Sequence, residues 1–199
     1  MSTKQLDVIV VGGGIAGASV AWFLAPHARV ALLEREPFAG FHTTGRSAAH
    51  FSESYGSPQV RALSRATRPF LERPPAGFAS HPILHPRGAL VIGSAEQAER
   101  VRAEYEAVRQ YTPSLSLLTG SAVQERVPVL RPEAASIAFF EPDSADIDVN
   151  ELHQGFLRGA RANGTALHRL NNNRFRAPVR EALAHHALLD GPLQRQRLG

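Results

Sequence analysis

The fold is decided by residues 7–34, which read DVIVVGGGIAGASVAWFLAPHARVALLE. Residues 7–11 are mostly β-branched and apolar, which predicts a buried strand of a parallel sheet. The small residues over 15–24 predict a helix that ends before Pro26, and residues 29–33 predict a second strand of the same kind. A strand, a helix and a strand within about 30 residues form a βαβ unit, whose crossover is right-handed.

Spaced glycines follow the first strand and continue into the first turn of the helix. Gly12, Gly14 and Gly17 fit the pattern G-x-G-x-x-G, which allows a tight turn, close approach of a pyrophosphate and close packing of helix on strand. The helix N-terminus offers N–H groups and a partial positive charge to a diphosphate. Glu34, 22 residues after Gly12, can accept hydrogen bonds from ribose hydroxyls. The sequence predicts a dinucleotide site, and this pattern alone leaves FAD and NAD as alternatives.

The rest of the chain also alternates between the two kinds of element, which indicates an α/β protein. Residues 39–56 are rich in Gly, Ser, Thr and His and are expected to form a loop that enters a short helix. We expect a helix after Ser57-Pro58, a strand over 87–92, an exposed helix over 95–111, a strand over 136–140, an amphipathic helix over 150–162 and a third parallel strand from residue 165.

Several long strings carry a resemblance to known flavoproteins. They include VGGGIAGAS over 11–19, LEREP over 33–37, FHTTGRSAAHFSESYGSPQVRAL over 41–63 and ADIDVNELHQGFLRG over 145–159. On these strings the chain resembles the D-amino-acid-oxidase-like (DAO) family of FAD-dependent oxidoreductases, and within it the bacterial FAD-dependent D-arginine dehydrogenases closely. The loop TTGRSAAH therefore favours FAD as the cofactor over NAD.

The resemblance implies a Rossmann-type FAD-binding βαβ domain with part of a mixed α+β substrate domain, truncated at its C-terminal end. The expected divisions are residues 1–56 for the FAD-binding unit and flavin-side loop, 57–148 for the partial substrate domain, 149–167 for the return to the FAD domain, and 168–199 for an atypical basic tail.

The resemblance also implies which residues bind the cofactor and the substrate. His50 matches a histidine beside the reacting centre, and Tyr55 matches a tyrosine on a mobile active-site loop; both are expected to be catalytic. Ser52, Tyr55 and Ala89 match positions of the substrate pocket. Cofactor contacts are expected from Gly12, Gly14, Ala16, Gly17, Glu34, Arg35, Thr43, Thr44, Gly45, Arg46, Ser47, Ala48, Ala49 and His50.

The reaction implied is oxidative deamination, in which a hydride leaves the α-carbon of an amino acid for FAD. The D-arginine enzymes carry a glutamate where this chain has Ala89. A carboxylate that faces a desolvated guanidinium selects strongly for a substrate with a cationic side chain. We therefore expect the substrate to be a D-amino acid with a neutral or apolar side chain. The sequence does not indicate the electron acceptor.

Composition excludes several other classes. The chain has no cysteine, so disulfides and thiolate chemistry are excluded. Its net charge of +4 arises in the last 32 residues, and it has one lysine, Lys4, so nucleic-acid binding is not expected. Residues 8–25 lack charge but contain four glycines, which argues against a membrane span and leaves a cytoplasmic location as the expectation. The His and acidic residues lack metal-ligand spacing, so no metal is expected.

The residues after Leu167 show no sustained periodicity and contain NNN, HH and QRQR. We expect them to be an out-of-frame extension, after which the second half of the family's substrate domain is missing. Two interpretations follow: the N-terminal portion of an FAD-dependent D-amino-acid dehydrogenase or oxidase, or a non-catalytic fragment that binds at most the ADP part of FAD.

Overall fold

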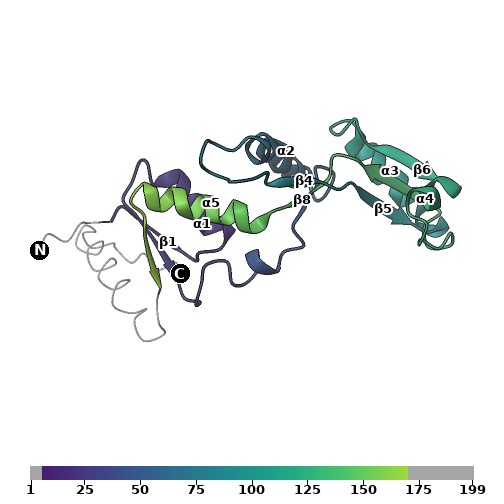
Figure 1. Cartoon of the computed structure of the whole chain (residues 1–199). Helices are drawn as coiled ribbons and strands as arrows, with labels where there is room; N and C mark the ends of the chain where they lie inside the picture. Colours follow the sequence, from purple (N-terminus) through teal and green to yellow (C-terminus); the bar gives the residue numbers. More distant parts are fainter. Residues whose placement is uncertain (1–5, 170–199) are drawn as a thin grey trace, which may run out of the picture. The chain divides into compact units, whose positions relative to one another are not determined.

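A computed structural model describes residues 6–169, which divide into two compact units (Figure 1). Within the described residues, unit 1 comprises 6–46 and 153–169, and unit 2 is the continuous stretch 47–152. The first boundary lies at Arg46, earlier than the expected boundary at residue 56, so the segment that carries His50 belongs to unit 2.

Unit 1 is built on a three-stranded parallel sheet in the order β1-β2-β9. β1 is Val8–Val11, β2 is Val30–Glu34 and β9 is Ala166–Arg169, with Val8 opposite Val30 and Ala31 opposite Ala166. The central strand β2 is buried, as its run of apolar residues predicts. The third strand continues through His168 and Arg169, two residues past the point where the atypical tail was expected to begin.

Two helices of unit 1 lie side by side. α1 covers Ile15–Leu24, as predicted, and α5 covers Val149–Ala162, of which the part from His153 on belongs to unit 1. The two helices meet where the Trp22 ring lies against Gly159, and a Cβ on this glycine would come within 2.2 Å of the indole nitrogen. The strand–helix–strand arrangement over residues 8–34 confirms the predicted βαβ unit.

Unit 2 contains two antiparallel three-stranded sheets. The first has the order β3-β8-β4, formed by His50–Phe51, Ala145–Ile147 and Leu84–Pro86. The second has the order β5-β7-β6, formed by Ala89–Gly93, Ile137–Glu141 and Ser116–Thr119. A turn over residues 141–144 joins β7 to β8 and so connects the two sheets.

Helices α2 (Pro58–Glu72), α3 (Ala98–Arg109) and α4 (Ser121–Arg126) complete unit 2. The hydroxyl of Ser57 accepts a hydrogen bond from Val60 N–H at 3.4 Å, which confirms the predicted start of α2. The helix expected over 95–111 is divided into a short 3₁₀ turn, η2 (Ala95–Gln97), followed by α3. The core between α3 and the β5-β7-β6 sheet consists of Val101, Val108, Leu115, Ile137 and Phe139.

Among residues 6–169, none of the helices combines the length and the apolar character that crossing a membrane requires.

Candidate functional site

The glycine loop of unit 1 adopts a conformation that only glycine accommodates well. Gly12 has φ = +99°, and its N–H donates to the carbonyl of Leu33 at 2.7 Å, which closes the turn after β1. A Cβ on Gly17 would come within 1.9 Å of the carbonyl oxygen of Gly12. The two positions therefore need glycine for the reasons that the sequence pattern indicates: one for the turn, the other for the close approach of α1 to the loop.

The N-terminus of α1 retains amides that can bind an anion. The first bond within the helix runs from Ala18 N–H to the carbonyl of Gly14, so in this described helix the earlier amides lack an intrahelical acceptor. One of them, Ile15 N–H, donates to the hydroxyl of Thr44 at 2.9 Å. The amides of Ala16 and Gly17 remain, no acidic residue lies in the first turn, and the helix dipole adds positive potential. This arrangement fits a diphosphate.

Glu34 lies at the end of β2, next to the glycine loop. One carboxylate oxygen accepts from Gly13 N–H at 2.8 Å, and the other accepts from the amides of Arg35 and Glu36 at 2.7 and 2.9 Å. An ionised carboxylate has about four lone-pair sites, so one acceptor direction remains for a hydroxyl. The carboxylate thus ties the strand end to the loop and can still bind a ribose.

The predicted flavin-side loop is divided between the two units. In unit 1, Thr44–Arg46 form a 3₁₀ turn, η1, in which Gly45 N–H donates to the carbonyl of Gly40 at 2.8 Å. Thr43 and Arg35 are exposed. In unit 2, Ser47 and Ala48 are exposed, and Ala49 is a non-glycine residue with φ = +54°. That strained conformation directly precedes His50, and such strain gathers at functional sites.

Sequence reasoning missed His153, which supports the glycine loop from α5. Its ring is buried, and its Nε2 lies 2.7 Å from the carbonyl oxygen of Gly13. Because a carbonyl only accepts, Nε2 carries the proton and donates. The ring also lies against Gly40, where a Cβ would come within 3.0 Å of its Cε1. No local pattern marks this histidine, since the two partners are 140 residues apart.

In unit 2, His50 is held by a buried serine. Its Nε2 lies 2.5 Å from the hydroxyl oxygen of Ser144, which has no exposed surface. The same hydroxyl donates to the carbonyl of Phe51 at 2.9 Å. His50 itself is exposed, so one edge of its ring is anchored on protein while the rest faces outward.

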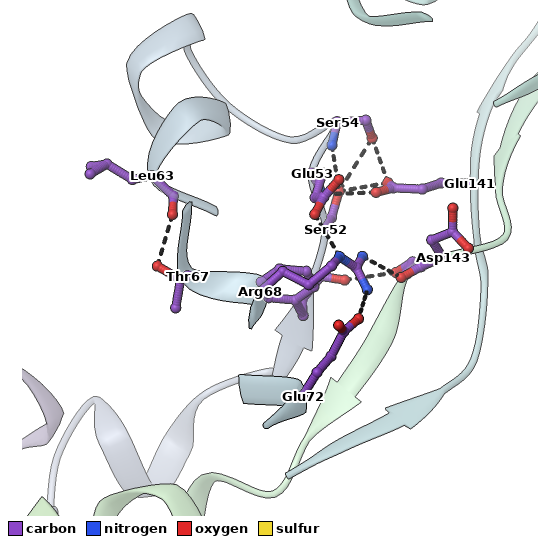
Figure 2. Close-up of polar contacts among 11 residues, drawn as sticks. Ser52, Glu53, Ser54, Leu63, Thr67, Arg68, Glu72, Glu141 and Asp143 are labelled. Carbon is purple, nitrogen blue, oxygen red and sulfur yellow. Dashed lines mark hydrogen bonds and ion pairs between the residues drawn. The ribbon is translucent and has the colours of Figure 1, made fainter. Parts of the chain in front are cut away.

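The residues after His50 are organised by a buried carboxylate, Glu141 (Figure 2). Glu141 is 2% exposed and accepts from the hydroxyls of Ser52 and Ser54 at 2.7 and 2.6 Å and from Glu53 N–H at 2.7 Å. The hydroxyl of Ser52 also accepts from the amides of Ser54 and Tyr55, each at 3.2 Å. Ser52, expected in the substrate pocket, thus uses its hydroxyl within the protein.

Arg68 of α2 fixes the same segment from the other side, as Figure 2 shows. Its guanidinium bonds to Glu53 at 2.6 Å, to Glu72 at 3.2 Å and to the carbonyl of Asp143 at 2.8 Å, and it lies over the Phe51 ring at 4.8 Å. Burial acts to lower the pKa of Arg68, but its hydrogen bonds to Glu53 and Glu72 outweigh burial and raise it. The segment carrying His50 is therefore rigidly supported.

The other two predicted substrate residues differ in their surroundings. Tyr55 is 77% exposed, at the point where the segment leaves Glu141. Ala89 begins β5 and lies directly opposite Glu141 in the β5–β7 register. The position expected to line the substrate pocket is therefore next to a carboxylate whose oxygens are already engaged by three donors.

The acidic residues near β8 form ion pairs with neighbouring cationic side chains. Arg87 bonds to Asp146 at 2.7 Å, and His81 lies 2.9 Å from Asp148. The bond to Asp148 raises the pKa of His81, whereas the Glu151 amide and His81 lower the pKa of Asp148, which caps α5. Within the described residues, no group of three or more His, Cys, Asp or Glu side chains is placed to hold a metal ion.

The comparisons with known proteins agree with this architecture. A family model described as FAD dependent oxidoreductase (DAO) matches residues 7–175. The chain is 24% identical to FAD-dependent oxidoreductase domain-containing protein 1 of Mus musculus and 26% identical to monomeric sarcosine oxidase of Arthrobacter sp. (strain TE1826). These alignments cover 94% and 81% of this chain and 42% of each relative, so the chain spans less than half the length of these curated relatives.

Solved structures give the same fold. Glycine oxidase from Geobacillus kaustophilus superimposes with a TM-score of 0.71 at 24% identity, over 84% of this chain and 47% of that one. The likeness supports the Rossmann-type α/β fold predicted from residues 7–34, in which the glycine loop and Glu34 lie together at the ends of β1 and β2.

Proposed function

Since the chain belongs to the DAO family of FAD-dependent oxidoreductases, we propose that it takes part in the oxidative deamination of a D-amino acid. The observation that carries this proposal is the cofactor cradle of unit 1: the tight turn at Gly12, the amides at the start of α1 and the carboxylate of Glu34. The exposed, anchored imidazole of His50 supports the chemistry.

The cradle suits the ADP half of FAD. The amides of Gly14, Ala16 and Gly17 would hold the diphosphate, because they lie in the loop and in the first turn of α1. Glu34 would accept from a ribose hydroxyl through its remaining acceptor direction. Arg35 and residues 43–50 would contact the rest of the cofactor.

FAD, when bound, supplies the acceptor for the hydride that leaves the substrate α-carbon; the amine loses a proton, and water hydrolyses the imine to a 2-oxo acid and ammonia. The protein orients the substrate and handles the proton. His50 would bind the substrate amine and take its proton, because an imidazole exchanges protons readily near neutral pH. Tyr55 would cover the substrate from its exposed position.

Ser52 supports this arrangement by position rather than by a direct bond. Its hydroxyl donates to Glu141 and accepts from the Tyr55 amide. The contribution of Ser52 to substrate binding is therefore to fix the path of the chain between His50 and Tyr55.

The side-chain specificity would follow from Ala89. No carboxylate stands at this position, and the neighbouring Glu141 is buried and engaged by three donors, so neither would pair with a cationic substrate. Losing such a charge pair costs about 2–5 kcal/mol, which corresponds to roughly 30- to 5,000-fold in discrimination. A D-amino acid with a neutral or apolar side chain is therefore the substrate class that fits best.

The test is a titration of the purified chain with FAD, followed by anaerobic addition of amino acids. We expect saturable quenching of flavin fluorescence, then bleaching of the flavin absorbance by D-leucine or D-methionine but not by their L-enantiomers. The matched control is Gly17→Ala, whose Cβ would meet the Gly12 carbonyl and which should abolish FAD binding.

Two results would contradict the proposal. Bleaching that is fastest with D-arginine would overturn the assignment of Ala89. Binding of ADP and FAD without any bleaching by amino acids would instead support the alternative, a non-catalytic nucleotide-binding chain.

A further inference from the structure

Ser144 touches His50 without being part of the segment predicted to carry the chemistry. Its hydroxyl oxygen lies 2.5 Å from His50 Nε2 and 2.9 Å from the carbonyl oxygen of Phe51. The two contacts share one oxygen that has a single proton. The position of that proton decides which nitrogen of His50 is protonated.

The carbonyl of Phe51 settles the direction of both bonds. A carbonyl only accepts, and its oxygen lies 2.9 Å from the Ser144 oxygen, so this contact is a hydrogen bond only when the Ser144 proton lies between the two oxygens. The Ser144 proton therefore lies on the bond to Phe51. The Ser144 oxygen is then the acceptor for His50, so Nε2 of the neutral imidazole carries the proton.

Ser144 itself cannot easily turn away from His50. Its carbonyl accepts from the amides of Arg87 and Gly88 at 3.1 and 3.0 Å, and its N–H donates to the Glu141 carbonyl at 3.4 Å. The turn is held further by the Arg68 bond to the Asp143 carbonyl. On the other side, Ile147 N–H fixes the Ala49 carbonyl at 2.7 Å, directly before His50.

The charged and titratable groups around His50 leave its second nitrogen available. Asp146 lies directly opposite His50 in the β3–β8 register, and its carboxylate bonds to Arg87 at 2.7 Å. His85 faces Asp146 from β4. Nδ1 of His50 makes no hydrogen bond within the described part of the chain.

We propose that Ser144 is a positioning residue that holds neutral His50 as the Nε2–H tautomer and so presents Nδ1 as the proton acceptor. The catalytic role of Nδ1 rests on the proposed function. In that reaction an N–H bond of the substrate ammonium breaks, and the proton forms a bond to Nδ1 of His50. The tautomer itself is a property of unit 2 and can be measured without cofactor or substrate.

The test uses long-range ¹H–¹⁵N correlation spectra of the ¹⁵N-labelled full chain, recorded at alkaline pH. The chain has nine histidines, so His50→Asn assigns the His50 signals by their loss. We expect one neutral form, protonated at Nε2. In Ser144→Ala the Nδ1–H form should rise about fivefold, the factor that one ordinary hydrogen bond provides.

A matched control is Ser136→Ala, which removes a partly buried hydroxyl that also faces a backbone carbonyl, that of Gly93. It should leave the tautomer unchanged. Ser144→Cys keeps the size of the side chain with a weaker acceptor and gives a second variant if the alanine protein does not fold; we expect an intermediate rise.

The inference is overturned if wild-type His50 is protonated at Nδ1, or if the tautomer ratio is the same in the wild type and both Ser144 variants. Its failure is distinct from failure of the proposed function. A chain that binds no FAD can still show the expected tautomer, and a chain that deaminates amino acids can still show the opposite one.

Discussion

Replacing Glu141 with glutamine removes a buried negative charge and leaves the shape of the side chain almost unchanged. Three donors meet the carboxylate at 2.6–2.7 Å: two serine hydroxyls and the Glu53 amide. The glutamine oxygen can accept from the Glu53 N–H, because a backbone N–H can only donate. The glutamine NH₂ then faces the hydroxyls of Ser52 and Ser54, which must rotate to accept.

The cost of this change can be worked out from the three bonds. A hydrogen bond to a charged group contributes about 1.5–3 kcal/mol and a neutral one about 0.5–1.5 kcal/mol, so each bond weakens by about 1 kcal/mol. The neutral amide is easier to bury than the carboxylate, which offsets part of this loss. We expect Glu141→Gln to destabilise unit 2 by about 2 kcal/mol.

Hydrogen–deuterium exchange with peptide resolution measures this loss in the full chain and separates the two units. Amides of β7, next to Glu141, should exchange about 30-fold faster in the variant, because 1.4 kcal/mol is a factor of ten. Amides of β2, in unit 1, should keep their rates.

The control is Glu125→Gln, an exposed glutamate of α4 that accepts from Ser121 at 3.2 Å. Exposed substitutions change stability by less than about 0.5 kcal/mol, or about twofold in exchange rate. If Glu141→Gln changes β7 exchange as little as this control does, the carboxylate does not organise the segment after His50 and the reasoning fails.

Three further predictions concern other contacts. Gly17→Ala should abolish FAD binding, measured by fluorescence titration, and retained affinity would contradict the predicted loop geometry. His153→Leu, which loses the donor to the Gly13 carbonyl, should weaken FAD binding about tenfold, whereas His153→Gln should restore most of it; equal affinities would rule out this role. The raised pKa of His81 means that its bond to Asp148 stabilises the fold below about pH 6.5 and is lost as pH rises through the folded pKa. His81→Gln should therefore lower the urea midpoint at about pH 6 and not at about pH 9, and a pH-independent difference would refute the linkage.

The elements of unit 1 were predictable because their signals are local. A β-branched run, three spaced glycines and an acid at the end of the next strand lie within residues 7–34, and the strand–helix–strand geometry couples them. The helix bounds of α1 agree with the prediction, since the uncharged helical run reaches Leu24 and Pro26 follows two residues later.

Most of unit 2 was not predictable from pattern. β3 and β8 are two and three residues long, too short for a periodicity of two to be visible, and they form a sheet only by pairing with each other and with β4. β6 and α4 were missed for the same reason, because tertiary contacts rather than propensity define them.

The candidate site divides in the same way. His50 and Glu34 were proposed as site residues from their place in recognisable strings, whereas Ser144, Glu141 and His153 act through partners 87 to 140 residues away. No spacing along the chain reports such contacts. Ser52 was predicted from its position to line the substrate pocket, but its hydroxyl donates to Glu141 within the protein.

The placement of unit 2 as a single stretch between the two parts of unit 1 sets an order for folding during synthesis. β2 emerges from the ribosome early, but its parallel partner β9 follows only after all of residues 47–152 have been made. Unit 2 has all of its strands before unit 1 does, although the chain begins with unit 1. Until β9 has been made, the nascent βαβ segment has one edge of β2 unpaired, and an unpaired strand edge is prone to aggregation.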